Sequence, residues 1–457
     1  MWSIMHMKAP IDEQILEFTF PRFQRVVLNN GLTLIVVEHH ELPEVNFRMG
    51  IKVGTKYVPE PFSGAAELIS ELLKKGSENY TYQELVEKID FIGAALETTV
   101  SEDFFYVLGK FLVEHFEIAM ELLREVVCTP QFPEEELDKE RARMIANLQN
   151  ERSSPHHLAQ RQMDKRLYHP HPYSFHKTEA TLQSITRDLL VQIHQKYFTP
   201  ENSVLVITGD ITPDDARVMV EKYLGNWERK AAPSEQFPRP DKPQKRIIHL
   251  IHRPDSEQVT VSIGVPAFPQ NHPDFIPAQV ANYILGGGSS GRLFQNLREK
   301  KGYTYGAYSA LELLQDAGSW LCEADVRTEV VDKALELFLE ELSRLRDELV
   351  EENELKVAHR YLIGSFPLKN ETPHSIASLI LKQQLYHLPE DFWNTYTQSI
   401  GEVDRESIRR IAQQYIDVDR LQMVVVGDGR QIVKQMEPFG ELKLFDVHEN
   451  ELSLSKL

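Results

Sequence analysis

The clearest hydrophobic pattern in the chain lies in residues 64–76. Apolar side chains recur there at intervals of three and four, which predicts an amphipathic helix with a buried stripe. The stripe consists of Ala66, Ile69, Leu72 and Leu73. Glycines stand at both ends of this segment, as is common at helix boundaries. Glu67, Ser70 and Glu71 share another face of the helix, because residues three and four apart are neighbours.

Alternating apolar residues predict β-strands in the rest of the first half. The expected strands are residues 23–28, 32–37, 45–53, 96–100, 104–111 and 204–208. Helices are expected at residues 81–92, 116–127 and 133–152. The first of these helices begins at Thr81, which can form a capping box with Glu84. The N-terminal residues 1–20 are expected to form an arm.

The second half of the chain repeats the first at a fixed distance. The matching positions, all 218 residues apart, are Leu167-Tyr168-His169 with Leu385-Tyr386-His387, Tyr197 with Tyr415, and Asp210 with Asp428. A repeat of this length indicates duplicated domains rather than a solenoid.

The predicted fold is therefore α+β, with two tandem homologous domains that are each a mixed β-sheet covered by helices. The first domain is expected to span residues 1–230 and the second residues 246–457. Residues 231–245 contain three prolines and are predicted to be a linker. The two domains are expected to face each other across a cleft, which is a favoured place for a ligand.

Composition narrows the possible functions. The chain has 457 residues, of which 42% are hydrophobic and 26% charged, as in ordinary globular proteins. It carries 50 basic and 69 acidic residues, a net charge of −19. We therefore expect no nucleic-acid or membrane partner, because both require a basic face. The sequence has no apolar run of about 18 residues and no signal peptide, which predicts a cytoplasmic protein.

Cysteines and histidines do not form a recognisable site. Cys128 and Cys322 are too few for a disulfide framework or a zinc ribbon, and both are expected to be buried free thiols. The clustered histidines are expected to be loop and packing residues, and they are His156, His157, His169, His171 and His176. Ser455-Lys456-Leu457 matches a peroxisomal signal, although three residues match easily by chance.

Several motifs together resemble the M16 metallopeptidase family, which includes insulinase, pitrilysin and mitochondrial processing peptidase. The first half contains L-N-N-G-L-T-L-I-V-V from Leu28 and N-S-V-L-V-I-T-G-D from Asn202. The second half contains L-G-G-G-S-S-G-R-L-F from Leu285, L-R-E-K-K-G-Y-T-Y from Leu297 and Y-L-I-G-S-F from Tyr361. The resemblance covers nearly the whole chain and implies the metallohydrolase fold of that family.

The resemblance also locates a zinc site that has lost its chemistry. The family holds zinc with two histidines of an H-x-x-E-H helix and a distal glutamate, and the glutamate of the helix is the general base. By resemblance, the histidine positions are Glu67 and Glu71, the base position is Ser70, and the distal position is Asn147. A serine cannot act as base for a metal-bound water. We expect no metal in this chain and a solvated face at these helix positions. A magnesium or calcium site is disfavoured, since it requires more oxygen ligands.

The second half keeps an R-x-x-x-G-x-x-Y pattern as Arg298, Gly302 and Tyr305. Related enzymes use this arginine and tyrosine to hold the substrate near zinc. In two-chain members, a companion without H-x-x-E-H supplies the pair to its catalytic partner. The resemblance implies that this chain is such a non-catalytic subunit, inactive alone, with a peptide substrate and with zinc in the partner. Alternatively, Arg298 pairs with Glu299 or another acid and Tyr305 is an ordinary strand residue.

A glycine-rich stretch follows the predicted helix at residues 278–285. It consists of Gly286, Gly287, Gly288, Ser289, Ser290 and Gly291. Nucleotide binding is not expected, because a dinucleotide loop follows a strand. A glycine-rich loop of the mitochondrial non-catalytic subunit touches substrate at this place, so these residues are a possible substrate loop. A tight turn that ends the helix is the alternative.

Three other functions remain open. The chain could be a structural subunit without proteolysis, or a homodimer that binds peptides without cutting them. An active peptidase with an unorthodox site is disfavoured by Ser70 and Asn147 together.

Overall fold

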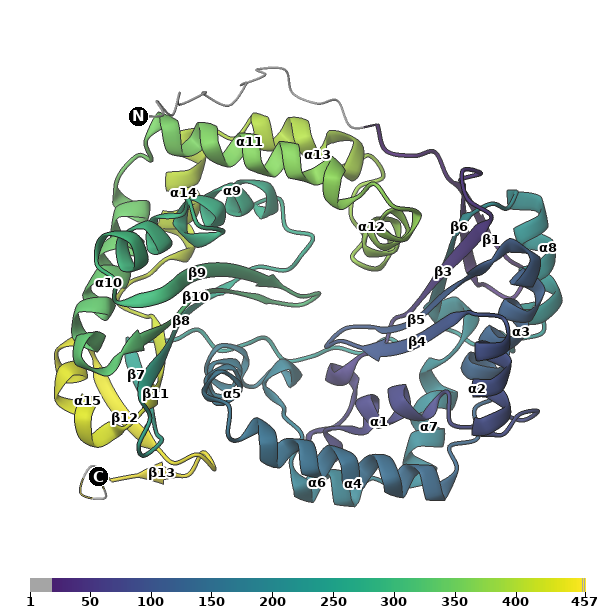
Figure 1. Cartoon of the computed structure of the whole chain (residues 1–457), viewed down its shortest axis with the longest axis horizontal. Helices are drawn as coiled ribbons and strands as arrows, with labels where there is room; N and C mark the ends of the chain where they lie inside the picture. The colour runs from purple at the N-terminus through teal and green to yellow at the C-terminus, as the bar shows by residue number, and fades with distance from the viewer. Residues whose placement is uncertain (1–18, 454, 456) are drawn as a thin grey trace, which may run out of the picture.

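The computed structural model describes residues 19–453, 455 and 457. Most of the predicted arm, residues 1–18, and Lys456 of the tail lie outside the described residues. The chain forms two halves, each with one mixed β-sheet and helices packed against it (Figure 1). The predicted α+β fold of two like halves is confirmed.

The two sheets repeat one strand order. The first sheet has the order β1-β2-β6-β3-β5-β4 and the second β13-β12-β7-β11-β8-β10-β9. The strands of the first are β1 (Gln24–Val27), β2 (Thr33–Glu38), β3 (Glu44–Ile51), β4 (Ala95–Val100), β5 (Phe105–Leu112) and β6 (Ser203–Gly209). Those of the second are β7 (Ile247–His252), β8 (Gln258–Ala267), β9 (Thr304–Leu313), β10 (Gly318–Arg327), β11 (Gln422–Gly427), β12 (Glu441–Phe445) and β13 (Glu451–Leu452). β2 pairs in parallel with β6, as β7 does with β11, and β4 and β9 are edge strands.

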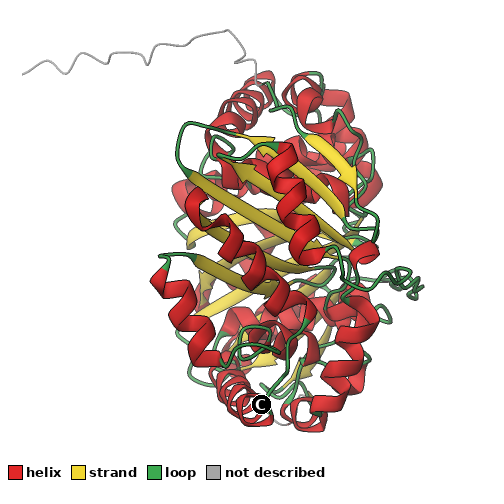
Figure 2. Ribbon diagram, turned by 90° about the vertical axis from the view of Figure 1, so that its right-hand side faces the viewer, coloured by secondary structure: helices red, strands yellow, loops and turns green. Residues whose placement is uncertain are grey.

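Helices cover the outer faces of both sheets (Figure 2). The first half has α1 (Ala65–Leu72), α2 (Tyr82–Phe91), α3 (Phe116–Cys128), α4 (Glu134–Glu151), α5 (Pro155–Tyr168), α6 (Glu179–Ser184), α7 (Arg187–Tyr197) and α8 (Pro213–Leu224). The second has α9 (Phe275–Gly286), α10 (Val331–Asp347), α11 (Glu352–Lys369), α12 (Pro373–Leu385), α13 (Phe392–Gly401), α14 (Arg405–Tyr415) and α15 (Gly429–Met436). The expected capping box of Thr81 and Glu84 is present at α2.

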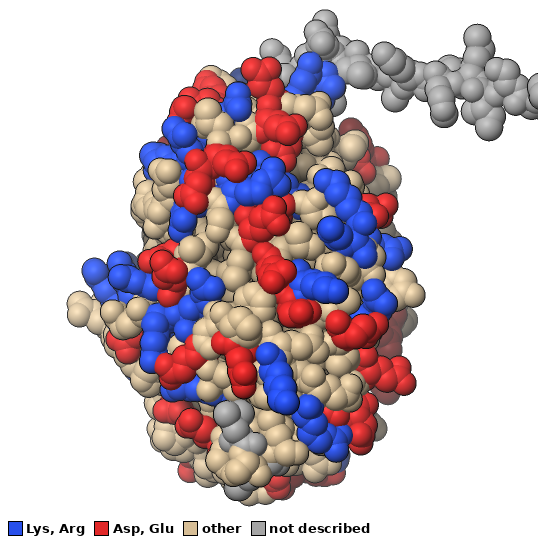
Figure 3. Space-filling view, turned by 90° about the vertical axis from the view of Figure 1, so that its left-hand side faces the viewer, with Lys and Arg blue, Asp and Glu red and all other residues tan. Residues whose placement is uncertain are grey.

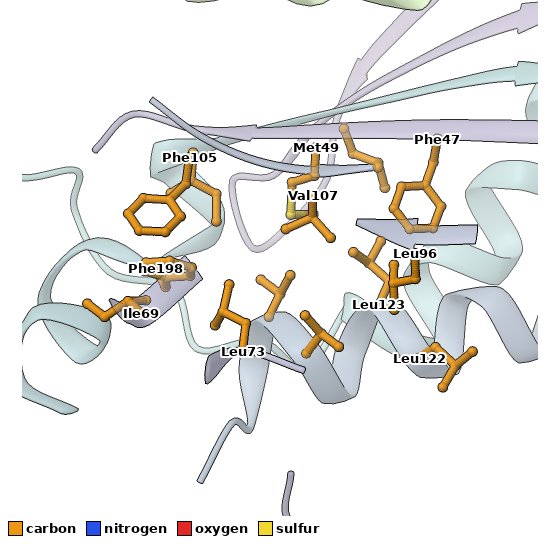
Figure 4. Close-up of a cluster of buried hydrophobic side chains, with 14 of the residues drawn as sticks. Phe47, Met49, Ile69, Leu73, Leu96, Phe105, Val107, Leu122, Leu123 and Phe198 are labelled. Atoms are coloured by element: carbon orange, nitrogen blue, oxygen red, sulfur yellow. The ribbon is translucent and has the colours of Figure 1, made fainter. Parts of the chain in front are cut away.

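The apolar stripe of α1 enters the core of the first half, as predicted. All four stripe residues are buried. Figure 4 shows Ile69 and Leu73 below Met49 of β3 and Val107 of β5, with Leu123 of α3 beside them. α1 ends at Leu72, before the expected boundary at Gly76. A left-handed φ of +142° at Gly76 turns the chain into an isolated bridge with Thr81 instead.

Free thiols, tail and surface complete the comparison with the sequence. Both cysteines are free, Cys322 buried and Cys128 half-buried. Leu457 packs against the core of the second half. None of the helices in the described part of the chain is long and apolar enough to cross a membrane. The outer face of the second half mixes acidic and basic side chains and has no continuous basic area (Figure 3).

Two helices are exchanged between the halves, which the sequence repeat does not reveal. α5 precedes the second half but packs on its strands β8 and β11. α12 belongs to the second half but packs on β3 and β6 of the first. Both helices lie in the space between the sheets (Figure 1). The halves are therefore interlocked by two buried clusters, one under each exchanged helix.

A glycine beneath each exchanged helix allows it to approach the sheet. The equivalent contacts are Gly50 with Leu381 and Leu385, and Gly264 with Met163 and Leu167. A Cβ atom added to Gly50 would lie 2.8 Å from a leucine methyl, and one added to Gly264 would lie 2.7 Å from a methionine sulfur. The side chains above the two glycines occupy repeat-equivalent positions, so both helices depend on the same device.

Replacing Gly50 by valine is expected to push α12 off the first sheet, because the new side chain overlaps two buried leucines. Overpacking of this kind costs about 1–3 kcal/mol of unfolding free energy. Urea unfolding measures the loss, and hydrogen exchange should speed up in α12. Gly364→Ala in α11 is the control, since an added Cβ meets nothing within 4 Å and alanine stabilises a helix by about 0.5–1 kcal/mol. Wild-type stability of the Gly50 variant would contradict the close contact.

A buried ion network also joins the halves. Lys56 is 2% exposed, and its Nζ lies 2.9 Å from Oδ1 of Asp103 and 2.6 Å from Oδ2 of Asp316. Tyr173 donates a hydrogen bond to Asp103, which also accepts one from the backbone N–H of Gln315 at 2.8 Å. Asp103 belongs to the first half and Asp316 to the β9–β10 turn of the second, so Lys56 ties the two together.

Replacing Lys56 by methionine is expected to cost about 3–5 kcal/mol of unfolding free energy, because it leaves the buried Asp103 carboxylate without its cation. Lys110→Met removes a more exposed pair with Glu44 and should cost at most about 1 kcal/mol. Denaturant unfolding of both variants tests the difference, and equal losses would show that the network does not stabilise the fold.

The same network predicts a loss of stability in acid. Burial alone would raise the pKa of Asp316, but hydrogen bonds from His171 and Lys56 outweigh it and hold the pKa at about 2. The unfolded state therefore takes up the proton first, so this stabilisation is present above pH 3.8 and is lost as the pH falls towards 2.

Candidate functional site

The residues at the predicted zinc positions lie in different environments on α1. Gly64 caps the helix with a left-handed φ of +104°. Ser70 is only 5% exposed, and its backbone oxygen accepts a hydrogen bond of 2.7 Å from Thr98 of β4. Glu71 is exposed, and Glu67 is half-buried. The expected solvated face is thus wrong for Ser70, because the edge strand of the sheet covers it.

Ion pairs between α1 and α4 bring the four zinc positions together. Lys75, just beyond α1, lies 3.3 Å from Glu140, and Glu71 lies 3.1 Å from Arg143. These contacts run in opposite directions along the two helices, so the next pair of facing residues is Glu67 and Asn147. Asn147 is exposed.

Protein cations supply the positive charge at these positions. Arg143 donates a hydrogen bond of 2.6 Å to Glu140 besides its pair with Glu71. Although burial would raise the pKa of Glu140, hydrogen bonds from Arg143 and Lys75 hold it below its usual value. Lys177 lies 3.6 Å from Glu67.

A zinc ion does not fit these residues. The carboxylates that replace the two histidines are paired with protein cations, the distal position is an amide, and the base position is a buried hydroxyl. Over residues 19–453, no group of three or more His, Cys, Asp or Glu side chains is placed to hold a metal ion. The predicted histidines serve other contacts. His156, for example, lies 3.0 Å from Asp325.

Arg298 and Tyr305 form an exposed pair at the start of β9. Arg298 lies on a π-helix (Phe294–Lys300), and Gly302 with a φ of +62° turns the chain back into the strand. The Arg298 guanidinium carbon lies 5.2 Å from the centre of the Tyr305 ring, a cation–π contact. Tyr305 is 81% exposed. Among the described residues Arg298 makes no ion pair, and the alternative pairing with Glu299 does not occur.

This pair is remote from the zinc positions of its own chain. Glu312, further along β9, lines the same cavity as Glu67. Tyr305 precedes Glu312 by seven residues, which corresponds to about 23 Å along a β-strand. The chain therefore does not bring Arg298 and Tyr305 to its own degenerate zinc positions.

The glycine-rich stretch connects α9 to the π-helix. Gly286 and Gly291 are packed so closely that an added Cβ would lie 2.6 Å from the backbone of Ser309 and 2.8 Å from Gly286, respectively. Ser290 contacts the Tyr283 hydroxyl at 3.1 Å and is exposed. The ends of the stretch thus form a tight turn against β9, and its middle is open to a ligand.

A cavity between the halves contains acidic residues that the sequence reasoning missed. It has a volume of about 440 Å³ next to Glu67, and an adjoining region of about 340 Å³ lies deeper. Glu102, Asp164 and Glu312 line both regions. One signal in the sequence was available, because the repeat places Lys382 218 residues after Asp164 and so reverses the charge at an equivalent position.

Models of known families agree with this architecture. Residues 34–179 match the model described as "Insulinase (Peptidase family M16)", and residues 184–362 match "Peptidase M16 inactive domain". The chain belongs to the M16 peptidase family. The M16 resemblance expected from the motifs is thereby confirmed.

Relatives of this M16 chain extend over most of its length. It is 25% identical to "Uncharacterized zinc protease YmxG" of Bacillus subtilis over 87% of this chain and 96% of that protein. It is 23% identical to "Non-peptidase homolog YmxG" of Helicobacter pylori over 87% of this chain and 92% of that protein. A crystal structure of a "peptidase M16 inactive domain" from Pseudomonas fluorescens superimposes with a TM-score of 0.83 at 25% identity, over 89% of this chain and 98% of that one.

Restoring three ligands should create a zinc site in this M16 chain. The variant with Glu67→His, Glu71→His and Asn147→Glu is expected to bind about one zinc per chain, since the helix pairing places all three on one side of α1. Metal analysis after dialysis measures it. The variant without the Asn147 change is the control and should bind zinc at least tenfold more weakly. Equal zinc binding by both variants would show that Asn147 does not face α1.

Proposed function

We propose that this chain is the non-catalytic subunit of a two-chain M16 zinc peptidase. It helps to enclose a peptide substrate and presents Arg298 and Tyr305 to the active site of a partner that carries H-x-x-E-H and the zinc ion. The observation that carries this proposal is the exposed Arg298–Tyr305 pair, which lacks a carboxylate partner and lies far from the zinc positions of its own chain.

The chemistry of the pair suits a reaction in trans. A guanidinium and a phenol both donate hydrogen bonds, so they can bind a peptide carbonyl and the oxyanion that forms from it. The ring below Arg298 holds the guanidinium in place without neutralising it. The name "Non-peptidase homolog" of the Helicobacter pylori relative supports a role without independent catalysis.

A second candidate is peptide binding without cleavage, in a homodimer or a structural assembly. The cavity between the halves favours it, because clefts between domains are common ligand sites. On this alternative, peptide binds without zinc and changes at Arg298 affect no reaction.

Arg298→Ala and Tyr305→Phe are each expected to lower the turnover of the reconstituted two-chain enzyme. Loss of one oxyanion donor costs about 10²–10³ in rate. Peptide cleavage is measured with equimolar subunits, and size-exclusion chromatography verifies assembly. Arg360→Ala, an exposed arginine of α11, is the matched control and should leave turnover unchanged. Wild-type turnover in both site variants would contradict the proposed role.

A further inference from the structure

We propose that the cavity between the halves binds a primary ammonium group of a peptide, through Glu102, Asp164 and Glu312. This inference deepens the proposed function, since it names a chemical feature of the enclosed peptide. It uses residues that take no part in the Arg298–Tyr305 pair.

The three carboxylates come from separate parts of the chain. Glu102 lies in the turn between β4 and β5, Asp164 on the exchanged helix α5, and Glu312 on β9 of the second half. Gln160 of α5 lies between the last two and donates a hydrogen bond of 3.2 Å to Asp164. The site is complete only when both halves and the exchanged helix are in place.

Protein cations do not neutralise these carboxylates. Within the described chain, Glu102 and Glu312 make no ion pair, and Asp164 has only His176 at 3.5 Å. Burial, helped by the charge of Arg161, lowers the pKa of His176 to about 3, so this imidazole is neutral near pH 7.

The basic residues at the rim of the cavity are already paired with other acids. Arg161 binds Glu449 at 3.1 Å, and Lys177 lies 3.6 Å from Glu67. The cavity therefore keeps an excess of negative charge that a cationic ligand can neutralise.

The pKa values show that this charge is unfavourable without a ligand. Burial raises the pKa of Glu102, Asp164 and Glu312, and neighbouring carboxylates raise each of them further. Buried charges are normally paired, because leaving water costs free energy. A cation in the cavity would remove the mutual repulsion.

A fourth polar group points to a ligand independently of the acidic cluster. Tyr168 is 3% exposed and lines the deeper region with the three carboxylates. Its hydroxyl is buried and has no hydrogen-bond partner in the described structure. Buried polar groups rarely stay unsatisfied, and a phenol oxygen can accept a hydrogen bond from an ammonium group.

The arrangement favours an ammonium group over other cations. The described residues hold no cluster that could bind a metal ion. An ammonium group has three donors that point in different directions, which suits three separate carboxylates. A guanidinium is planar and prefers two parallel bonds to one carboxylate. The ammonium group can come from the free amino end of a peptide or from a lysine side chain.

Calorimetric titration of the isolated chain at pH 7.5 tests this assignment with three short peptides. The probes are Ala-Ala-Ala amide with a free amino end, N-acetyl-Ala-Lys-Ala amide, and the neutral N-acetyl-Ala-Ala-Ala amide. At least one ammonium peptide should bind tenfold more tightly than the neutral peptide, and the tighter one identifies the source of the ammonium. Equal binding of all three would overturn the proposal. An N-acetyl-Ala-Arg-Ala amide that binds as tightly would overturn the preference for ammonium.

Variants of the carboxylates locate the site. Glu312→Gln and Asp164→Asn should each weaken binding of the ammonium peptide at least tenfold, as expected for loss of a hydrogen bond to a charged group. Their melting temperatures should equal or exceed that of the wild type, since each change removes an unpaired buried charge. Glu87→Gln on the exposed face of α2 makes the same chemical change and should not alter binding.

Wild-type affinity in both Glu312→Gln and Asp164→Asn would overturn the proposal. The partner subunit is absent from these titrations, so their result is separate from that of the Arg298 experiment. Loss of the role of Arg298 with intact ammonium binding would reject the two-chain mechanism alone.

Discussion

The exchange of α5 and α12 is the constraint on which the rest of the structure depends. Each helix covers the sheet of the other half, and a glycine of that sheet allows the close contact. The halves consequently cannot separate without exposing two hydrophobic clusters. The cavity between them is a fixed part of the fold, and α5 brings Asp164 and Tyr168 against Glu312 of the second sheet.

Charge explains how the zinc positions tolerate the loss of the metal. Arg143 and Lys75 bind Glu71 and Glu140 across α1 and α4, so the carboxylates that face this space remain neutralised. Deeper in the cavity no such cations are available, and the acids keep their excess charge. The two regions therefore differ in function: the first is a closed ion-pair network, and the second is open to a cationic ligand.

Local sequence patterns predicted most of the fold but little of its assembly. The stripe on α1, the capping box of α2 and the strand order repeated at 218 residues follow from periodicity and turn chemistry. The burial of Ser70 could not be predicted, because it results from β4 lying over α1 in space. The same holds for the exchange of α5 and α12, since a repeat shows which segments are alike but not which sheet each one covers.

The candidate site was only partly visible for a similar reason. Arg298, Gly302 and Tyr305 form a motif in sequence, and the φ of Gly302 explains the spacing. Glu102, Asp164 and Glu312 come from distant segments and have no common pattern, so they could be found only once the fold placed them around one cavity.

The most direct test of the central claim is to purify the protein from its native source and identify what remains bound to it. The account predicts a roughly equimolar M16 chain that carries H-x-x-E-H, zinc in the complex, and peptide cleavage only when both chains are present. Self-association alone, without zinc and without cleavage, would contradict it.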